Sequence, residues 1–172
     1  MKRLFLALWP DDSTRQAISG LVEQIGSAGI KSVKPSNLHV TLVFLGNVDV
    51  TTELSIRQQL DKIASRALSI QFDEISYWRK PGIICLTSEQ QPGKDLLGLV
   101  RKLDAIAKSC GLVTDTRPYQ AHITLARKAC FQPEGVFDPI IWRAEAFCLV
   151  ASVSGNNGVE YRVLQSWSLT KD

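Results

Sequence analysis

Leu38-His39-Val40-Thr41-Leu42 and Ala121-His122-Ile123-Thr124-Leu125 are the two stretches that say most about this chain. Each contains His, a β-branched apolar residue, Thr and Leu in that order, and together they hold the only two histidines of the sequence. Residues two apart on a β-strand point to the same face, so each stretch predicts a strand with its His and Thr on one face. The histidines lie 83 positions apart, close to half the chain, which indicates that each half contributes one equivalent strand.

The segments around these strands predict a mixed α/β or α+β domain, because strands and helices alternate along the chain. Short apolar runs predict strands, and apolar residues at helical spacing predict helices. We expect strands at Arg3–Trp9, Leu38–Leu45, two segments of 69–87 separated by Arg79–Gly82, Ala121–Leu125, and a hairpin of Glu145–Ser154 and Val159–Leu169 turned by Gly155-Asn156-Asn157-Gly158. We expect helices after the capping residues 11–13, over Thr51–Leu68 and over Gly93–Cys110.

Length and composition predict one folded domain, 1–172. The chain has 172 residues, of which 45% are hydrophobic and 22% charged, as is usual for a globular protein. Its apolar runs are far shorter than the roughly eighteen residues that a membrane span needs, and the N-terminus does not read as a secretory signal. We expect a cytoplasmic protein without a membrane partner. No long apolar stripe calls for a second subunit, so we also expect a monomer.

Charge and cysteine content narrow the kinds of ligand. A net charge of +3 favours a small phosphate-bearing ligand over the long nucleic-acid backbone that a concentrated basic stripe would follow. The four cysteines have neither the C-x-x-C spacing of zinc sites nor the clustering of a disulfide scaffold. We interpret them as reduced thiols, mostly in the core: Cys85, Cys110, Cys130 and Cys148.

If the two strands are neighbours, His39, Thr41, His122 and Thr124 converge on one cleft. Imidazole has an unperturbed pKa of about 6.5, so a facing pair can act as general acid and general base near neutral pH. In-line cleavage of a phosphodiester needs such a pair, and threonine hydroxyls can bind the non-bridging oxygens without a metal. The alternative is that both histidines are hydrogen-bonded strand residues without a catalytic role.

With these motifs the sequence resembles the RNA 2′,3′-cyclic phosphodiesterases, also called 2′-5′ RNA ligases, of the 2H phosphoesterase superfamily. Residues 37–46 resemble the first motif of that family, and Arg117-Pro118-Tyr119 with residues 122–127 resembles the second. The stretches 3–8 and 161–169 are similar to its opening and closing strands. The resemblance therefore runs over the whole chain.

The resemblance implies a bilobal fold of two antiparallel sheets flanked by helices, with the cleft between the lobes. It also implies opening of an RNA-terminal 2′,3′-cyclic phosphate to a 2′-phosphomonoester, with neither metal nor cofactor. The expected partner is an RNA 3′ end or a small nucleotide that carries a cyclic phosphate. We assign His39 as general acid and His122 as general base, although the near-symmetry of the motifs leaves this order open, and Thr41 and Thr124 as phosphate-binding residues.

Arg127 matches the phosphate-contacting arginine of the family. Because it follows Thr124 by three positions, a regular strand would place it on the opposite face. It reaches the phosphate only through a strand end, a bulge or a twist.

Several other residues have both a functional and a structural interpretation. Tyr119 and Phe44 are candidates to stack on a terminal base, or else they belong to the core. Basic residues at positions 31, 34, 79 and 80 attract an RNA end or are simply solvated. We interpret the four tryptophans as structural.

Other functions remain open at this point. A different cyclic or 2′-5′ phosphodiester, including 2′-5′ RNA ligation, would use the same chemistry at phosphorus. A nucleotide-binding module without turnover is a second alternative, although binding alone has no use for an opposed acid and base. A metallohydrolase is a weak third, since the two histidines are far apart and no carboxylate lies at ligand spacing. The sequence contains neither G-x-S-x-G nor a P-loop motif.

Overall fold

The computed structural model describes residues 1–26, 29–155 and 158–170. Within these ranges the chain forms strands β1 Lys2–Leu8, β2 Lys31–Ser32, β3 Val40–Val48, β4 Leu68–Phe72, β5 Glu74–Trp78, β6 Ile83–Thr87, β7 Ile123–Arg127, β8 Ile140–Ala144, β9 Ala146–Gly155 and β10 Gly158–Ser168. Its helices are α1 Asp12–Ile25, the short 3-10 helix η1 Pro35–Asn37, α2 Val50–Leu60 and α3 Lys94–Ser109.

The main sheet consists of two antiparallel halves that meet at the two His-x-Thr strands. One half has the order β10-β9-β1-β3, and the other has β7-β6-β5 with β2 also paired to β7. The halves join where Val40 of β3 pairs with Ile123 of β7, and both residues are fully buried. The predicted fold, in which each half gives one His-x-Thr strand, is confirmed.

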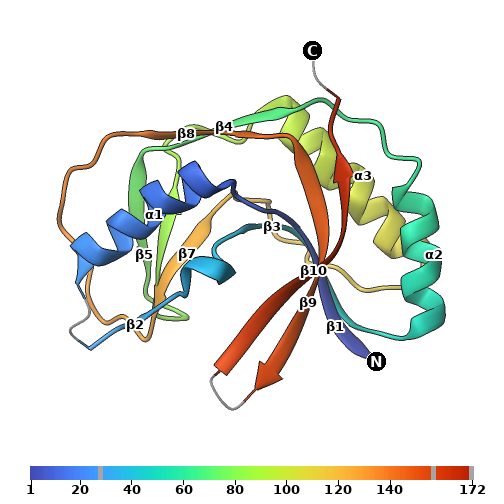
Figure 1. Ribbon diagram of the computed structural model, residues 1–172, viewed down its shortest axis with the longest axis horizontal. Helices are drawn as coiled ribbons and strands as arrows, with labels where there is room; N and C mark the ends of the chain where they lie inside the picture. The colour runs from blue at the N-terminus through green and yellow to red at the C-terminus, as the bar shows by residue number, and fades with distance from the viewer. Residues whose placement is uncertain (27–28, 156–157, 171–172) are drawn as a thin grey trace.

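The helices and a small second sheet surround the core. Figure 1 shows α1 on the left, where it contacts β8 and η1, α2 and α3 on the right, where α3 contacts β3, and β4 and β8 across the top. The core face of α3 carries its buried residues at helical spacing, as the sequence predicted. They are Leu96, Leu99, Leu103 and Ala107.

β1 is buried on both faces, which is why its sequence is almost wholly apolar. Leu4, Leu6 and Leu8 belong to the main core. The opposite face carries a second, smaller apolar cluster of Phe5, Ala7, Cys148 and Val150, flanked by Trp9 and Tyr161. This second cluster lies behind one of the two histidines.

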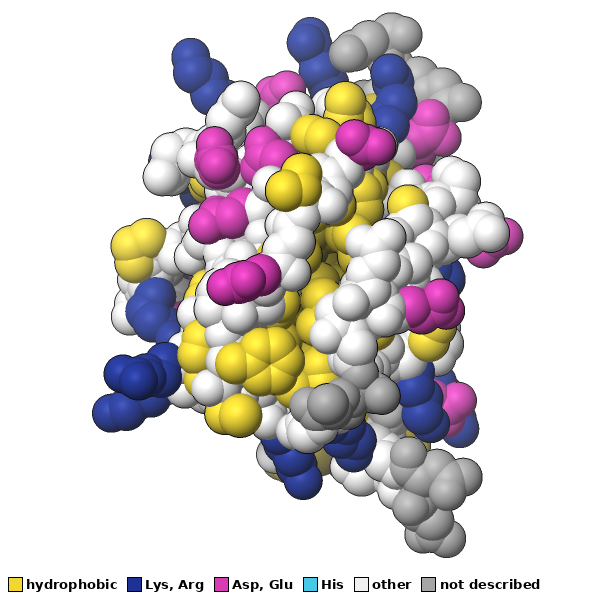
Figure 2. All heavy atoms as spheres, turned by 90° about the vertical axis from the view of Figure 1, so that its left-hand side faces the viewer, with side chains coloured by type: hydrophobic (Ala, Val, Ile, Leu, Met, Phe, Trp, Pro, Cys, Tyr) yellow, Lys and Arg dark blue, Asp and Glu magenta, His cyan; other side chains and the backbone are white. Residues whose placement is uncertain are grey.

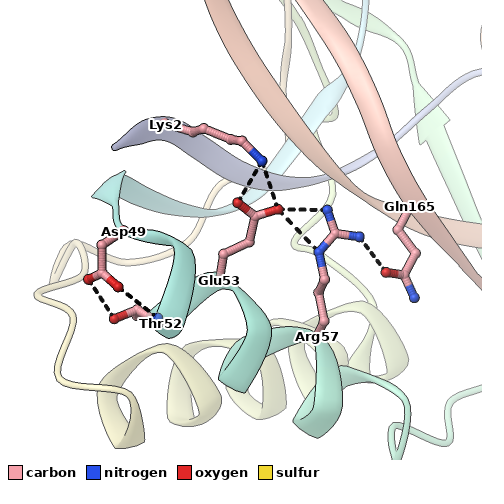
Figure 3. A network of polar contacts seen from close by, with 6 residues as sticks. All are labelled: Lys2, Asp49, Thr52, Glu53, Arg57 and Gln165. Atoms are coloured by element: carbon pink, nitrogen blue, oxygen red, sulfur yellow. Dashed lines mark hydrogen bonds and ion pairs between the residues drawn. The ribbon is translucent and has the colours of Figure 1, made fainter.

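Local signals set the starts of the first two helices. Asp11 caps α1 by accepting the amide of Thr14 at 2.9 Å, and Asp49 caps α2 by accepting the amide of Thr52 at 2.9 Å (Figure 3). At the end of α1, Gly26 has φ of +79°, a conformation that glycine adopts without strain.

A buried carboxylate holds α2 against the sheet (Figure 3). The side chain of Glu53 is 7% exposed and accepts from Lys2 of β1 at 2.9 Å and from Arg57 at 2.7 Å. Arg57 in turn donates to Gln165 of β10 at 2.5 Å. The network ties α2 to β1 and β10, which are strands from opposite ends of the chain.

The predicted helix over Thr51–Leu68 is wrong at its C-terminal end. α2 stops at Leu60, and Leu68 begins β4, where Leu68, Ile70 and Phe72 are buried alternately against β8. Residues 69–87 accordingly complete three strands, not two, and β8 was not predicted. The pairing of Leu68 with Ala144 spans almost half the chain, so no local pattern announces it.

The remaining elements follow the predictions within a few residues. β9 and β10 form the expected hairpin with Gly155 paired to Gly158, whereas the predicted turn residues Asn156 and Asn157 lie outside the described residues. Cys85 and Cys148 are buried, but Cys110 is half-buried and Cys130 is exposed, so only half of the thiols are in the core.

The face that carries α1 has a hollow lined by both apolar and polar side chains. A cavity of about 330 Å³ lies between α1 and the segment before β8, and it is lined by Leu21, Val136, Phe137 and Ile140 among others. Figure 2 shows apolar side chains along a furrow on this side of the molecule. No helix in the described part of the chain is both long and apolar enough to cross a membrane.

Candidate active site

The pairing of β3 with β7 interleaves the two His-x-Thr motifs. With Val40 opposite Ile123, an antiparallel register places His39 across from Thr124 and Thr41 across from His122. Since Val40 and Ile123 point into the core, the four polar side chains point to the other face. All four line one cavity, as the sequence predicted.

Each imidazole is held by the main-chain carbonyl two residues before it. Nδ1 of His39 lies 2.6 Å from the carbonyl oxygen of Asn37, and Nδ1 of His122 lies 3.0 Å from that of Gln120. A carbonyl only accepts hydrogen bonds, so Nδ1 carries the proton of each neutral ring and Nε2 keeps its lone pair, which in His39 accepts from the hydroxyl of Thr41 at 3.1 Å. Nε2 is therefore the atom of each ring that can exchange a proton with a substrate.

Arg127 reaches the same cavity because β7 has a bulge at Leu125. Thr124 pairs with Cys85 of β6, and Ala126 pairs with Ile84, the residue directly before Cys85. Leu125 is therefore an extra residue on β7 without a partner on β6. A bulge shifts the alternation of faces by one, which brings Arg127 to the face of Thr124. Arg127 lines the cavity with both histidines, so the condition set by the sequence is met.

β3 has an equivalent bulge at Leu42. Ala7 pairs with Thr41 and Leu6 with Val43, which leaves Leu42 as the extra residue. Phe44 consequently shares a face with Thr41, as Arg127 does with Thr124. The two halves thus match from histidine to bulge, but one presents an aromatic ring where the other presents a guanidinium.

His39 lies among aromatic rings. The ring of Trp9 stacks on it at 5.8 Å between centroids, Phe5 lies at 4.9 Å, and Tyr161 meets it edge-on at 5.0 Å. Burial there lowers the pKa of His39 to about 4, because an imidazolium loses its hydration. The positive charge of Arg127, and that of His122 when it is protonated, lower the pKa further, against the opposing effect of the bond to Asn37.

His122 has a more open environment. One ring, that of Trp78, contacts it at 4.7 Å between centroids. Burial and the charge of Arg127 lower the pKa of His122 too, while the bond to Gln120 opposes them. Both histidines are therefore neutral at pH 7 in the protein alone, and His39 is the harder of the two to protonate.

Two cavities meet at the paired motifs, and Thr41, Phe44 and His122 line both. The larger, of about 670 Å³, extends past Trp78 and Tyr119 toward α3. The smaller, of about 510 Å³, extends from Arg127 toward β2 and the β9–β10 hairpin. We call them the aromatic arm and the basic arm of the cleft.

Comparison with known proteins agrees with this geometry. Residues 8–85 match the family model described as LigT like Phosphoesterase. The RNA 2′,3′-cyclic phosphodiesterase of Archaeoglobus fulgidus is 30% identical over 77% of this chain and 76% of its own length. The chain belongs to the LigT-like phosphoesterase family.

Full-length relatives extend the match across the fold. The RNA 2′,3′-cyclic phosphodiesterase of Escherichia coli is 28% identical over 99% of this chain and 98% of its own. Crystal structures of E. coli LigT, in apo form and complexed with 3′-AMP, each superpose with a TM-score of 0.87 at 26% identity over 98% of both chains.

The LigT-like phosphoesterase site includes residues that the sequence analysis passed over. Trp9, Trp78 and Tyr161 contact the histidines, whereas the sequence predicts only a structural role for the tryptophans. Asn37, the first residue of its motif, holds the ring of His39 through its main-chain carbonyl. Scattered aromatic residues carry no spacing signal, so only the fold could place them beside the histidines.

Tyr119 and Phe44, the two candidates for base stacking, differ in their surroundings. The hydroxyl of Tyr119 donates to the main-chain oxygen of Thr41 at 3.1 Å, and its ring packs against the core. Burial raises the pKa of this phenol, which thus stays protonated. Phe44 is 43% exposed at the junction of the two arms. Tyr119 supports the strand, whereas Phe44 presents an exposed ring with the guanidinium of Arg3 over it at 5.1 Å.

A buried thiol lies next to Thr124 of the cleft. Burial raises the pKa of Cys85, which faces Thr124, to about 11, so this thiol is protonated at neutral pH. Among the described residues, no three His, Cys, Asp or Glu side chains gather into a metal-ligating group.

Proposed function

We propose that this chain hydrolyses an RNA-terminal ribose 2′,3′-cyclic phosphate to a 2′-phosphomonoester. The observation that carries the proposal is the interleaved register, which puts two ring Nε2 atoms and two threonine hydroxyls on one face with Arg127. The relatives named RNA 2′,3′-cyclic phosphodiesterase support this substrate class. The partner is an RNA 3′ end or a small nucleotide with a cyclic phosphate.

The proposed reaction is an in-line displacement at phosphorus. Nε2 of His122 takes a proton from water as the water oxygen bonds to phosphorus. The bond from phosphorus to O3′ breaks, and His39 protonates O3′ from the opposite side. Thr41, Thr124 and Arg127 bind the non-bridging oxygens, where charge accumulates in the transition state. The product keeps its phosphate on O2′.

The donor role of His39 depends on the substrate, since burial holds its pKa near 4 in the protein alone. An anionic phosphodiester beside the ring favours the imidazolium, and it also offsets the positive charge of Arg127. Substrate binding thus raises the pKa of His39 toward the working pH. In the opposite order, with His39 as base, the pKa of His122 would have to rise instead, so the two assignments differ in a measurable way.

We further propose that residues 1–172 act as one domain and as a monomer, because both motifs and both arms come from a single chain. Size-exclusion chromatography with light scattering tests this, and a dimer mass would overturn it.

The test of the activity uses a short RNA ending in a 2′,3′-cyclic phosphate, incubated in EDTA with the parent protein, His39→Ala or His122→Ala. We expect the parent alone to give a 2′-phosphate. A 3′-phosphate would reverse the leaving group. If none of the three proteins converts the RNA, the proposed activity is wrong, and binding of the same RNA without turnover would then indicate a nucleotide-binding module.

A further inference from the structure

The geometry points to a cleft with a fixed direction: the aromatic arm holds the terminal base, and the basic arm holds the phosphate on the 5′ side of the terminal nucleotide. This inference rests on the proposed function and adds to it that the preferred substrate is an oligonucleotide end instead of a cyclic mononucleotide. It assigns Trp78 to the base and Lys31 with Arg3 to the upstream backbone.

The aromatic arm has the composition of a base site. Trp78 and Phe44 line it on either side of the catalytic face, Trp78 from β5 and Phe44 from β3. Charged residues line its far end, where Lys108 pairs with Asp104 at 2.7 Å and Arg117 pairs with Asp115, and where Arg101 of α3 adds one more exposed cation. Paired charges offer little to an anion, whereas the rings of half-buried Trp78 and exposed Phe44 can stack on any base.

The basic arm has the composition of a backbone site. Arg3, Lys31, Lys34 and Arg127 line it, and none of the described residues that line it is acidic. Lys31 extends toward the β9–β10 hairpin, since a Cβ placed on Gly158 would lie 3.8 Å from its Nζ. Cations on both sides of an open groove attract a phosphate in a sequence-independent way.

The substrate's own connectivity matches this division. From a cyclic phosphate on O2′ and O3′, the base leaves the ribose at C1′ and the chain continues through the 5′ oxygen. The base and the 5′ chain therefore point away from each other. The two arms likewise extend in different directions from His122 and Thr41, which line both of them. The guanidinium of Arg3 lies 5.1 Å from the ring of Phe44, at the point where base and backbone would part.

The test of the basic arm compares adenosine 2′,3′-cyclic monophosphate with a trinucleotide that ends in the same group. We expect the trinucleotide to have a kcat/KM about tenfold higher or more, and a steeper loss of affinity with salt. Lys31→Ala with Arg3→Ala should lower this ratio toward one, whereas Lys94→Ala, an exposed cation outside both arms, should leave it unchanged. The inference is overturned if the parent shows a ratio near one, or if the double variant keeps the high ratio of the parent. Hydrolysis of the mononucleotide would in either case still support the proposed function.

The test of the aromatic arm adds a trinucleotide whose terminal ribose carries the cyclic phosphate but no base. Trp78→Ala should raise KM about tenfold for the substrate with a base, the scale typical of lost base stacking, and leave KM for the base-less substrate unchanged. Trp78→Phe should restore most of the affinity. Equal losses on both substrates would mean that Trp78 merely supports His122, and the assignment of the base would be wrong.

Discussion

Asn37 and Tyr161 join the first motif to the last strand. The side-chain oxygen of Asn37 accepts the amide of Tyr161 at 3.1 Å, and its Nδ2 donates to the carbonyl of Val159 at 2.8 Å. The main-chain carbonyl of the same Asn37 holds the ring of His39, while the ring of Tyr161 contacts that histidine edge-on. β10 therefore fixes the orientation of a histidine that lies more than a hundred residues earlier in the chain.

We expect Asn37→Ala to lower kcat more than it raises KM, because it frees the loop that orients His39 without removing a phosphate contact. The two lost bonds, to the half-buried amide of Tyr161 and the carbonyl of exposed Val159, also cost about 0.5–1.5 kcal/mol of stability each. Steady-state kinetics over a range of pH, beside thermal melts, measure both effects. A variant that melts lower but keeps kcat and its pH profile would limit Asn37 to a structural role.

His39→Ala and His122→Ala should each reduce kcat/KM about 10²- to 10⁴-fold, since each removes one proton transfer. The double variant should lose little more than either single one, because residues that act in one step are not additive. Single-turnover assays with folded variants, checked by circular dichroism, test this. Losses that multiply in the double variant would contradict a shared step.

The pH optimum of kcat/KM should lie below 6.5, the ordinary pKa of histidine. This parameter reports the free enzyme, in which burial lowers the pKa of both histidines, so the protonated acid is lost at a lower pH than usual. The optimum of kcat should lie higher, because bound phosphate raises both pKa values. Proton NMR titration of the two rings, with and without a 2′-nucleotide, follows each site, and a His39 pKa that does not rise with ligand would contradict the donor role.

Arg127→Gln should raise KM and lower kcat, while Arg127→Lys should recover only part of the loss, because lysine offers a single charge in place of a planar fork of donors. Arg143→Gln serves as the matched control, since Arg143 is exposed on β8 away from the cleft. Steady-state measurement of kcat and KM for these variants on one cyclic phosphate substrate tests the prediction. An Arg127→Gln variant with the kinetics of the parent would remove Arg127 from the phosphate site.

Glu53→Gln should destabilise the fold by about 1–3 kcal/mol without changing kcat, because it breaks the buried contacts of Glu53 with Lys2 and Arg57 far from the cleft. The exposed pair of Glu160 and Arg162 gives the control, and Glu160→Gln should change stability by less than about 1 kcal/mol. Urea unfolding measures both. Equal stability of the two variants would show that the Glu53 network contributes no more than a surface ion pair.

The sequence predicts the positions of the histidines and threonines of the site, but it does not predict the position of Arg127. Alternation along a strand is local, so the sequence placed His39 with Thr41 and His122 with Thr124 on shared faces. The face of Arg127 depends on the bulge at Leu125, which arises from pairing with β6 and leaves no local mark. The over-long second helix failed for the same reason, because the pairing with β8 that turns 68–72 into a strand lies far along the chain.

The sequence by itself determined the reactive groups, two imidazoles and two hydroxyls at a spacing that suits strands, and it determined the order of most helices and strands. Only the tertiary structure decided how these groups face one another, which aromatic rings make His39 harder to protonate than His122, and that the cleft has one aromatic and one basic arm. Residue type and strand parity are properties of a short segment, whereas desolvation, charge and cavity shape depend on contacts between segments that only folding brings together.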